Sequence, residues 1–242
     1  MIALSLSGWL AASGAGIAAG AVRRALAGRM ESVARACHEL RGPLAAARLG
    51  LQLGARTGEL SPDRLRAIDL ELGRATLALE DLSNAGGRGG GTWRAPEPVD
   101  LKQLVSDSVE AWRPAAAARG VSLELSWSGA SPAVWGDRLR LAQATGNLIA
   151  NAIEHGGGAV SVRGFGEPGR VRIEVIDTGP GLPASVSELV RRPHGGRGRR
   201  GRGLAIATAV VTSHGGRLAA APSSGGARLV IELPASRGGE SA

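Results

Sequence analysis

The stretch Asn147-Leu148-Ile149-Ala150-Asn151-Ala152-Ile153-Glu154-His155-Gly156 combines a helical pattern with evenly spaced polar side chains. Asn147, Asn151 and His155 follow one another at intervals of four, so they share one face of a helix. Two asparagines are poor choices for a helix that needs only a solvated face. Carboxamide oxygens beside phosphate oxygens suit Mg²⁺, which prefers oxygen ligands. We therefore expect a helix over Asp137–Glu154 whose polar face binds a ligand, with Mg²⁺ beside phosphate as the chemistry that fits.

A second candidate cluster, Asp177-Thr178-Gly179-Pro180-Gly181-Leu182, follows the expected strand Val171–Ile176. A carboxylate at a strand end can accept a hydrogen bond from an amino group such as that of adenine. The two glycines allow the backbone to approach a ligand closely. A simple strand-ending turn has the same residue types, so this cluster alone does not decide between a site and a turn.

A third cluster, Gly201-Arg202-Gly203-Leu204-Ala205-Ile206, places glycines directly before the expected helix Leu204–Ser213. The free N–H groups and the positive end of the helix dipole at such a position bind phosphate. A short glycine motif is weak evidence by itself, because a flexible loop before a capped helix has the same composition.

The remaining patterns around these clusters alternate between helix and strand, which predicts an α+β fold. Helices would pack on one face of a largely antiparallel sheet. The further elements expected are the helix Leu101–Arg119 and the strands Val121–Trp127, Val160–Arg163, Arg217–Ala221 and Leu229–Leu233.

Upstream, two heptad-like series of apolar residues predict a pair of amphipathic helices. Ser61-Pro62 supplies an N-cap and a first-turn proline for the second helix. Such an αα-hairpin buries little by itself, so we expect two copies to pair as a four-helix bundle. The expected seam consists of Val33, Cys37, Leu40, Leu44, Ala47 and Leu51 in the first helix, and Leu65, Ile68, Leu72, Ala75, Leu79 and Leu82 in the second.

His38 follows the seam position Cys37, so the helical period places it off the buried stripe and toward solvent. Pro43 removes a backbone donor shortly after it. Cys37 is expected to be a small core residue without chemistry.

A glycine-rich segment, Asn84–Gly91, separates the hairpin from the mixed α/β region and is closed by Pro96 and Pro98. The expected domains are therefore the hairpin over 23–84, a linker over 85–98, the α/β domain over 99–235 and a disordered tail over 236–242.

The segment Met1–Val22 has no charged residue, and Arg23, Arg24 and Arg29 follow it. It just reaches the length of a membrane-spanning helix, and flanking positive charge marks the cytoplasmic side. We expect a single-pass anchor in the cell membrane with the rest of the chain in the cytoplasm. A cleaved secretory signal is the main alternative, although it lacks a basic start. A buried helix remains a further alternative because the segment is only marginally hydrophobic.

The composition of the 242-residue chain narrows the functional classes. A hydrophobic content of 43% excludes a disordered chain, and one Cys excludes an intrachain disulfide framework and a multi-Cys zinc cluster. The net charge of +8 is almost entirely due to arginine. It could serve nucleic acid or anionic lipid, and a nucleic-acid-binding protein that uses the arginine-rich loops stays an alternative. The lack of aromatic platforms beside the arginines argues against single-strand binding, and the main interpretation expects no nucleic-acid partner.

The string His38-Glu39-Leu40-Arg41-Gly42-Pro43-Leu44 resembles the H box of sensor histidine kinases. Behind it, in order, the three clusters resemble the N, G1 and G2 boxes of the ATP-binding domain in the GHKL superfamily. The resemblance extends over roughly Arg29–Pro234. Behind the expected membrane helix, it implies a hairpin forming a dimeric four-helix bundle and an α/β-sandwich domain of the Bergerat fold.

The resemblance also implies roles for single residues, with ATP and Mg²⁺ as cofactors. His38 would accept the phosphoryl group and pass it to an Asp of a response-regulator receiver domain, and Glu39 would orient His38 or take its proton. Asn151 would be the main Mg²⁺ ligand, supported by Asn147, and Asp177 would bind the adenine amino group. The other implied nucleotide contacts are His155, Gly179, Gly181, Gly201, Gly203 and Leu204.

Several positions depart from the family pattern. The phenylalanine-bearing F box is absent, and Arg199 and Arg200 stand where the family has Gly and Thr. Glu154 replaces a common Lys. Gly42 replaces the Thr or Asn of relatives with phosphatase activity, so we expect weak or no phosphatase activity. A scaffold with little or no catalytic activity that docks a partner is the alternative to a working kinase.

Overall fold

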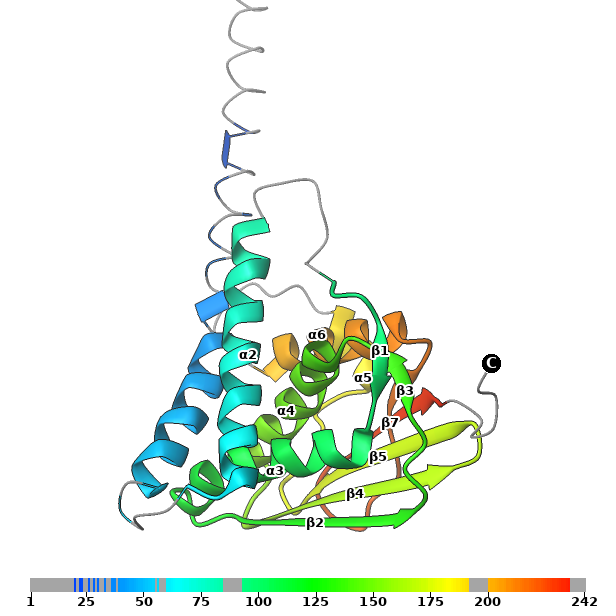
Figure 1. Cartoon of the computed structure of the whole chain (residues 1–242). Coiled ribbons are helices and arrows are strands. Elements are labelled where there is room, and N and C mark those ends of the chain that lie inside the picture. Colours follow the sequence, from blue (N-terminus) through cyan, green and yellow to red (C-terminus); the bar gives the residue numbers. More distant parts are fainter. Residues whose placement is uncertain are drawn as a thin grey trace, which may run out of the picture.

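The computed structural model describes residues 39–54, 60–84, 93–191 and 200–235, with single helical residues before and between them at 20, 22, 23, 26, 28, 30, 33, 36, 37 and 56. Two long helices, here called the hairpin, stand beside a layered α/β unit, here called the sheet domain (Figure 1). The hairpin comprises the helix that contains residues 39–54 and α2, Pro62–Asn84. The expected α+β class is confirmed.

The sheet has five strands in the order β2-β4-β5-β7-β6. Strands β2 and β4 are parallel, and every other neighbouring pair is antiparallel, which confirms the expected largely antiparallel sheet. The bounds are β2 Ser122–Gly129, β4 Ala159–Glu167, β5 Arg170–Asp177, β6 Arg217–Ala220 and β7 Arg228–Pro234.

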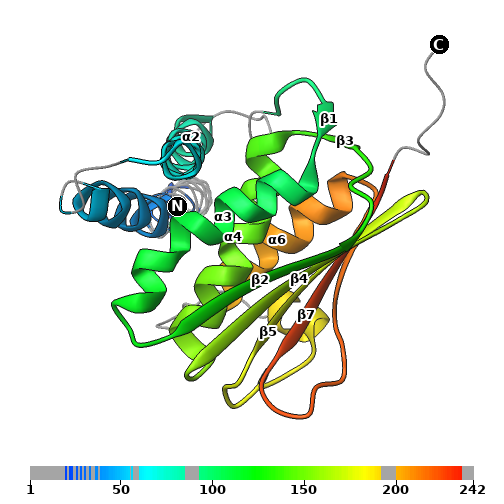
Figure 2. The same cartoon turned by 60° about the horizontal axis from the view of Figure 1, so that its bottom comes forward.

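Three helices cover one face of this sheet and leave its other face open (Figure 2). They are α3 Leu101–Ala117, α4 Arg138–His155 and α6 Arg200–Ser213. Aspartates define where two of them begin: Asp100 accepts a hydrogen bond from the Gln103 amide, and Asp137 accepts from the amides of Leu139 and Arg140.

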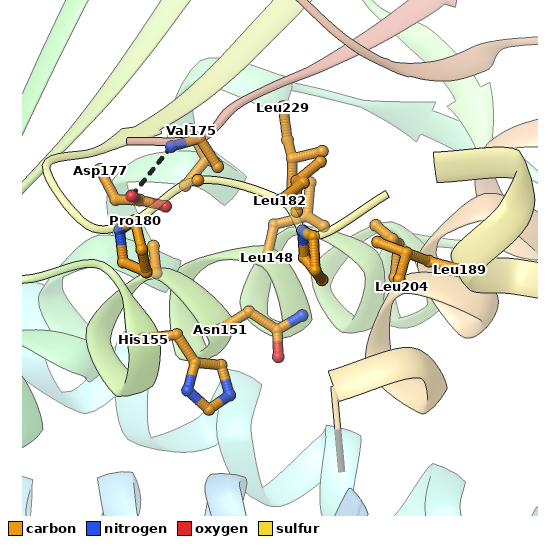
Figure 3. A pocket seen from close by; sticks show the side chains of 14 residues that line it. Leu148, Asn151, His155, Val175, Asp177, Pro180, Leu182, Leu189, Leu204 and Leu229 are labelled. Atoms are coloured by element: carbon orange, nitrogen blue, oxygen red, sulfur yellow. Dashed lines mark hydrogen bonds between the residues drawn. The ribbon is translucent and has the colours of Figure 1, made fainter. Parts of the chain in front are cut away.

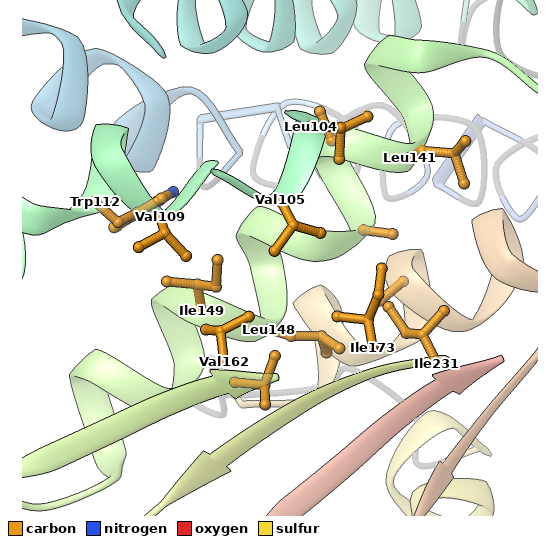
Figure 4. Close-up of a cluster of buried hydrophobic side chains, with 14 of the residues drawn as sticks. Leu104, Val105, Val109, Trp112, Leu141, Leu148, Ile149, Val162, Ile173 and Ile231 are labelled. Carbon is orange, nitrogen blue, oxygen red and sulfur yellow. The ribbon is translucent and has the colours of Figure 1, made fainter. Parts of the chain in front are cut away.

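The core between helices and sheet consists of aliphatic side chains, as the scarcity of aromatics requires. Leu104, Leu148, Ile149, Val162 and Ile173 are at most 1% exposed and interdigitate between the two layers (Figure 4). Their burial fixes α4 against β5, because both contribute to this core. The polar face of α4 therefore points away from it, toward the rim where β5 ends.

Two features of the sheet domain were not expected from the sequence. Strands β1 (Glu97–Val99) and β3 (Val134–Gly136) form a separate antiparallel pair. The short helix α5 (Val186–Arg191) begins at Ser185, whose hydroxyl accepts from the Glu188 amide while the Glu188 carboxylate accepts from the Ser185 amide. This reciprocal arrangement is a capping box.

The hairpin helices meet where the chain has small residues. An added Cβ at Gly50 would lie 3.2 Å from Cγ1 of Ile68, so a larger side chain at residue 50 would push α2 away. The expected start of α2 is confirmed, because Ser61 Oγ accepts a hydrogen bond from the Arg64 amide directly before the first-turn Pro62.

The expected seam of the hairpin is only partly buried within one chain. Ala47, Ile68 and Ala75 are buried, but five leucines of the seam are about half exposed, and Cys37 is exposed. The assignment of Cys37 to a core therefore depends on the expected pairing of two chains, because Cys37 is exposed in one chain alone. The exposed members, here called the leucine stripe, are Leu44, Leu51, Leu65, Leu72 and Leu79.

The opposite face of α2 packs on the sheet domain. Leu70 and Leu77 have no exposed surface and join the same hydrophobic core as α3 and α4. Periodicity alone predicted one apolar face on this helix, whereas the structure gives it two, because α2 contacts both the first helix and the sheet domain.

The part of the expected linker that the structure describes, from Trp93 onward, lies on the sheet domain. The Trp93 ring is 5.7 Å from that of His214, and the Arg140 guanidinium lies 5.3 Å from the Trp93 centroid. The Arg94 amide donates to Asp137 at 3.0 Å. These contacts join residues that are distant in sequence. Composition cannot reveal such contacts, so it predicted that this segment is part of the linker.

The predicted anchor Met1–Val22 lies outside the described residues except for Gly20 and Val22, and the tail over 236–242 lies outside them as well. Among the residues that are described, no helix is both long and apolar enough to cross a membrane.

Candidate active site

A pocket opens between α4, the end of β5 and the start of α6 (Figure 3). Its walls are mostly aliphatic, and its polar side chains are few. The apolar lining includes Leu148, Val175, Leu182, Leu189, Leu204 and Leu229, and the polar lining consists of Asn151, His155 and Asp177.

Asp177, the last residue of β5, is held in the pocket by backbone amides. Its Oδ1 accepts hydrogen bonds from the Gly179 amide at 2.9 Å and the Ala227 amide at 3.0 Å. Two donors on one oxygen fix the carboxylate plane. Its other oxygen accepts no hydrogen bond from the described residues, and an acceptor of this kind suits an amino group.

Three glycines let the chain close around Asp177. An added Cβ would lie 2.4 Å from Asp177 Cβ at Gly156, 2.5 Å from the His155 oxygen at Gly179 and 1.9 Å from the Asp177 oxygen at Gly226. Gly226 also has a φ of 74°. The sequence motif predicted a site role for Gly179 but not for Gly156 or Gly226, because the closeness of these two glycines to Asp177 depends on tertiary packing.

Gly181 has a φ of 80° and lines the pocket, as expected for a residue in the turn after β5. Thr178 fixes this turn, because its amide donates to the Gly156 oxygen at 2.9 Å and its hydroxyl accepts from the Ala159 amide.

The three polar residues of α4 do not all face this pocket. Asn151 and His155 line it, whereas Asn147 lines a second cavity on the hairpin side. Their common helix face is confirmed, but it extends across two cavities that adjoin at Asn151.

The glycine cluster lies inside a helix and not in a loop before it. Helix α6 begins at Arg200, so Gly201 and Gly203 occupy its first turn, and Leu204 is buried in the pocket wall. An added Cβ at Gly203 would lie 3.3 Å from Asn151 Nδ2, so the helix start and the asparagine face each other directly. Whether the glycines precede the helix or lie in its first turn, the first backbone amides of an α-helix have no carbonyl partner within that helix.

The second cavity, with about 800 Å³ of empty space, lies between the hairpin and the sheet domain. Glu39 and Gly42 line it from the hairpin, and Asn147, Asn151 and Gly203 line it from the sheet domain. The Glu39 carboxylate accepts a hydrogen bond from Gln143 Nε2. His38 itself lies outside the described residues, as do Arg199 and the side chain of Arg200.

Gly42 allows the hairpin to approach α3 closely. An added Cβ there would lie 3.1 Å from Cη2 of Trp112, whose side chain belongs to the core of the sheet domain. Gly42, which departs from the family pattern, thus also lies at a contact between the hairpin and the sheet domain.

Residues 136–237, which contain this pocket, match the profile of the histidine kinase-, DNA gyrase B- and HSP90-like ATPases. The sheet domain therefore belongs to this class of ATP-binding domains.

Similar proteins and a similar solved structure show to which class of ATPases the chain belongs. The sensor protein KinB of Pseudomonas aeruginosa is 31% identical over 219 residues, which is 85% of this chain and 37% of KinB. The histidine-protein kinase BaeS of Escherichia coli is 33% identical over 224 residues, covering 86% of this chain and 47% of BaeS. A mycobacterial sensor histidine kinase structure, MprB, is 30% identical with a TM-score of 0.51, covering 59% of this chain and 99% of that one.

The chain belongs to the sensor histidine kinases. It spans less than half the length of KinB and BaeS.

Proposed function

We propose that the chain is an ATP-dependent histidine kinase that phosphorylates its own His38 and passes the phosphoryl group to an Asp of a response-regulator receiver domain. The main support is that the pocket around Asp177 adjoins, at Asn151, a cavity lined by Glu39, the neighbour of His38 in sequence. A nucleotide in the first cavity would thus have its phosphates directed toward the hairpin.

The residues present fit ATP. The free oxygen of Asp177 accepts from the adenine amino group, and the aliphatic walls exclude water from the base. The first-turn amides of α6, beside Gly203, face the phosphates. Positioning of this kind supplies most of the rate in phosphoryl transfer.

The residues also fit Mg²⁺, provided that the phosphates supply most ligands. Among the described residues no group of three or more His, Cys, Asp or Glu side chains could hold a metal ion. The Asn151 carboxamide oxygen is the side-chain ligand beside the pocket, and Mg²⁺ commonly binds with one or two protein ligands, phosphates and waters. When bound, Mg²⁺ neutralises phosphate charge.

In the proposed reaction a neutral His38 nitrogen attacks the γ-phosphorus. The N–P bond forms, the bond to the β,γ-bridging oxygen breaks, and ADP leaves with that oxygen. The remaining imidazole proton passes to Glu39. An Asp carboxylate of the receiver domain then takes the phosphoryl group and regenerates His38.

The decisive experiment incubates the purified chain with γ-labelled ATP and Mg²⁺. We expect an acid-labile label that disappears in His38→Gln while ATP binding persists. Asp177→Asn should weaken ATP binding and reduce the label. ATP binding without any label in the wild type would contradict kinase activity and indicate the inactive scaffold.

We further propose that two chains pair through the leucine stripe. Exposed leucines at 65, 72 and 79 repeat every seven residues on α2, which is the spacing of a helix-bundle seam. Substituting Leu72→Asp should convert a dimer into a monomer in analytical ultracentrifugation. The control is Asp63→Ala, because Asp63 is exposed and lies on the other side of the same helix, nine residues before Leu72.

The anchor and the domain boundaries 1–22, 23–84, 85–98, 99–235 and 236–242 are part of the same proposal. Flotation with liposomes tests the anchor: the full chain should float, and a chain lacking residues 1–22 should not.

A further inference from the structure

Glu39 of the hairpin, the neighbour of His38 in sequence, is held by a buried side chain of the sheet domain. Nε2 of Gln143, on α4, donates a hydrogen bond to Oε2 of Glu39. Gln143 is 3% exposed, so this donor is shielded from water. A hydrogen bond to a charged oxygen in such surroundings is stronger than one at the surface, and it fixes the direction of the carboxylate.

The carboxamide of Gln143 is itself oriented by a neighbour on α4. Its Oε1 accepts a hydrogen bond at 3.3 Å from Nη1 of Arg140, which lies one helical turn earlier. A guanidinium has donors only, so it can face only the oxygen of a carboxamide. The carboxamide nitrogen therefore lies on the other side, where Glu39 is.

Arg140 is in turn attached to the hairpin. Its Nη1 and Nη2 donate to the two carboxylate oxygens of Asp81, on α2. The hydrogen-bonded series Asp81, Arg140, Gln143, Glu39, here called the relay, thus begins on α2, crosses α4 and ends on the first helix of the hairpin. Connected hydrogen bonds of this kind strengthen one another and hold each member in one orientation.

The relay ends at the group that accepts a proton in the proposed reaction. Glu39 lines the second cavity, which adjoins the nucleotide pocket at Asn151. A general base needs a fixed distance and direction to the proton that it takes. An ionised carboxylate has about four acceptor positions, so the bond from Gln143 holds Glu39 without blocking its action as a base.

We propose that Gln143 is a positioning residue for proton transfer: it holds Glu39 in the orientation in which Glu39 takes the imidazole proton of His38. Arg140 and Asp81 hold Gln143. This inference rests on the proposed function. Because the donor to Glu39 belongs to the sheet domain, the base is in place only while the hairpin is docked on α4.

The first test is Gln143→Met, which has a similar shape but no donor. Arg140 keeps both bonds to Asp81, so the variant should stay folded. With γ-labelled ATP and Mg²⁺, we expect the autophosphorylation rate at saturating ATP to fall by about tenfold or more, a part of what general-base catalysis contributes. The ATP concentration that gives half the maximal rate should stay unchanged, because Gln143 does not line the nucleotide pocket.

Thr145→Val is the matched control on the same helix. Thr145 is 2% exposed, and its hydroxyl donates to the Leu141 oxygen within α4. This variant also removes a buried polar group from α4, but it leaves the relay intact. It should take up label at the wild-type rate, and an equal fall in rate for Thr145→Val and Gln143→Met would overturn the inference.

The second test separates positioning of the base from docking of the hairpin. Glu39→Gln keeps an oxygen that accepts from Gln143, but a carboxamide cannot take the imidazole proton. Adding Gln143→Met to Glu39→Gln should therefore leave the residual rate unchanged. A further fall, as large as the fall that Gln143→Met causes in the wild type, would show that Gln143 only docks the hairpin and would overturn the inference.

Failure of the proposed function can be told from failure of this inference. A wild type that binds ATP but takes up no label overturns both. A wild type that labels His38, beside a Gln143→Met variant with an unchanged or higher rate, overturns this inference alone. A Glu39→Gln variant that labels as fast as the wild type does the same, because Glu39 is then not the base.

Discussion

Asp81 of the hairpin and Arg140 of α4 are joined by two parallel hydrogen bonds, each 2.6 Å long. Burial by itself would lower the pKa of Arg140, but the hydrogen-bonded and negatively charged Asp81 raises it above its ordinary value, with help from Asp137 and Glu39. A bidentate pair of this kind fixes both distance and orientation. It therefore holds α2 in register on the start of α4.

Asp81→Asn should weaken this attachment, because Arg140 stays buried while its partner loses charge and one acceptor. We expect the free energy of unfolding to fall by about 1–3 kcal/mol in urea titrations. The control is Asp69→Asn, an exposed aspartate on the same helix. An unchanged midpoint for Asp81→Asn would contradict a stabilising role for the pair.

Asp177→Asn should reduce ATP affinity by about 10- to 100-fold, the range for a hydrogen bond with a charged partner. The variant still accepts from the Gly179 and Ala227 amides through its remaining oxygen, so its fold should persist. Calorimetric titration and circular dichroism together check both statements. Tight ATP binding by this variant would mean that another group recognises the base.

Gly156→Ala should disturb Asp177 directly, since the new Cβ would lie 2.4 Å from the Asp177 Cβ. Overpacking of this kind costs about 1–3 kcal/mol, and ATP binding should weaken with it. Gly158→Ala is the control two residues away, where an added Cβ meets nothing within 4 Å. Similar melting temperatures for the two variants would refute the argument.

Gly42 offers no side chain to orient a hydrolytic water, and Trp112 occupies the space beside it. The wild type should therefore show little or no dephosphorylation of a phosphorylated receiver domain in the absence of ATP. Decay of labelled receiver is the measurement. A clear acceleration of this decay by the wild type would show that another residue performs this role.

The pair formed by Glu232 of β7 and Arg217 of β6 predicts an acid-dependent stability. A hydrogen bond from Arg217 lowers the pKa of Glu232 in the folded chain. A lowered pKa gives stability that is present above the unfolded value, near pH 4.3, and is lost as the pH falls below it. Melting temperatures of wild type and Glu232→Gln should differ at about pH 7 and converge at about pH 3. A constant difference would contradict this linkage.

Elements with a strong local signal were predictable from the sequence. Helix α2 begins at Pro62 behind the Ser61 cap, and α4 begins behind Asp137, as the residue types at those positions require. Asp177 ends a strand and lines the pocket as expected. In each case the residues that determine the feature are neighbours in sequence, so the feature can be predicted from the sequence pattern.

Features that depend on distant partners were not predictable. Strands β1 and β3 have three residues each, and they are stabilised by their pairing and by the burial of Val99 and Val134 in the core. The carboxamide of Asn147 is oriented by Arg74, a residue of another helix. Helix periodicity identified the face of Asn147 and Asn151 correctly, yet it could not tell that the face is divided between two cavities.

The attachment of Trp93 between Arg140 and His214 limits the travel of the ATP-binding domain. Helix α2 ends at Asn84, so eight residues of sequence, 85–92, separate the hairpin from Trp93. A segment of that length spans roughly 30 Å at most, even when fully extended. In the proposed reaction, this upper limit on distance determines whether the domain can reach the histidine of its own chain, that of a paired chain, or both.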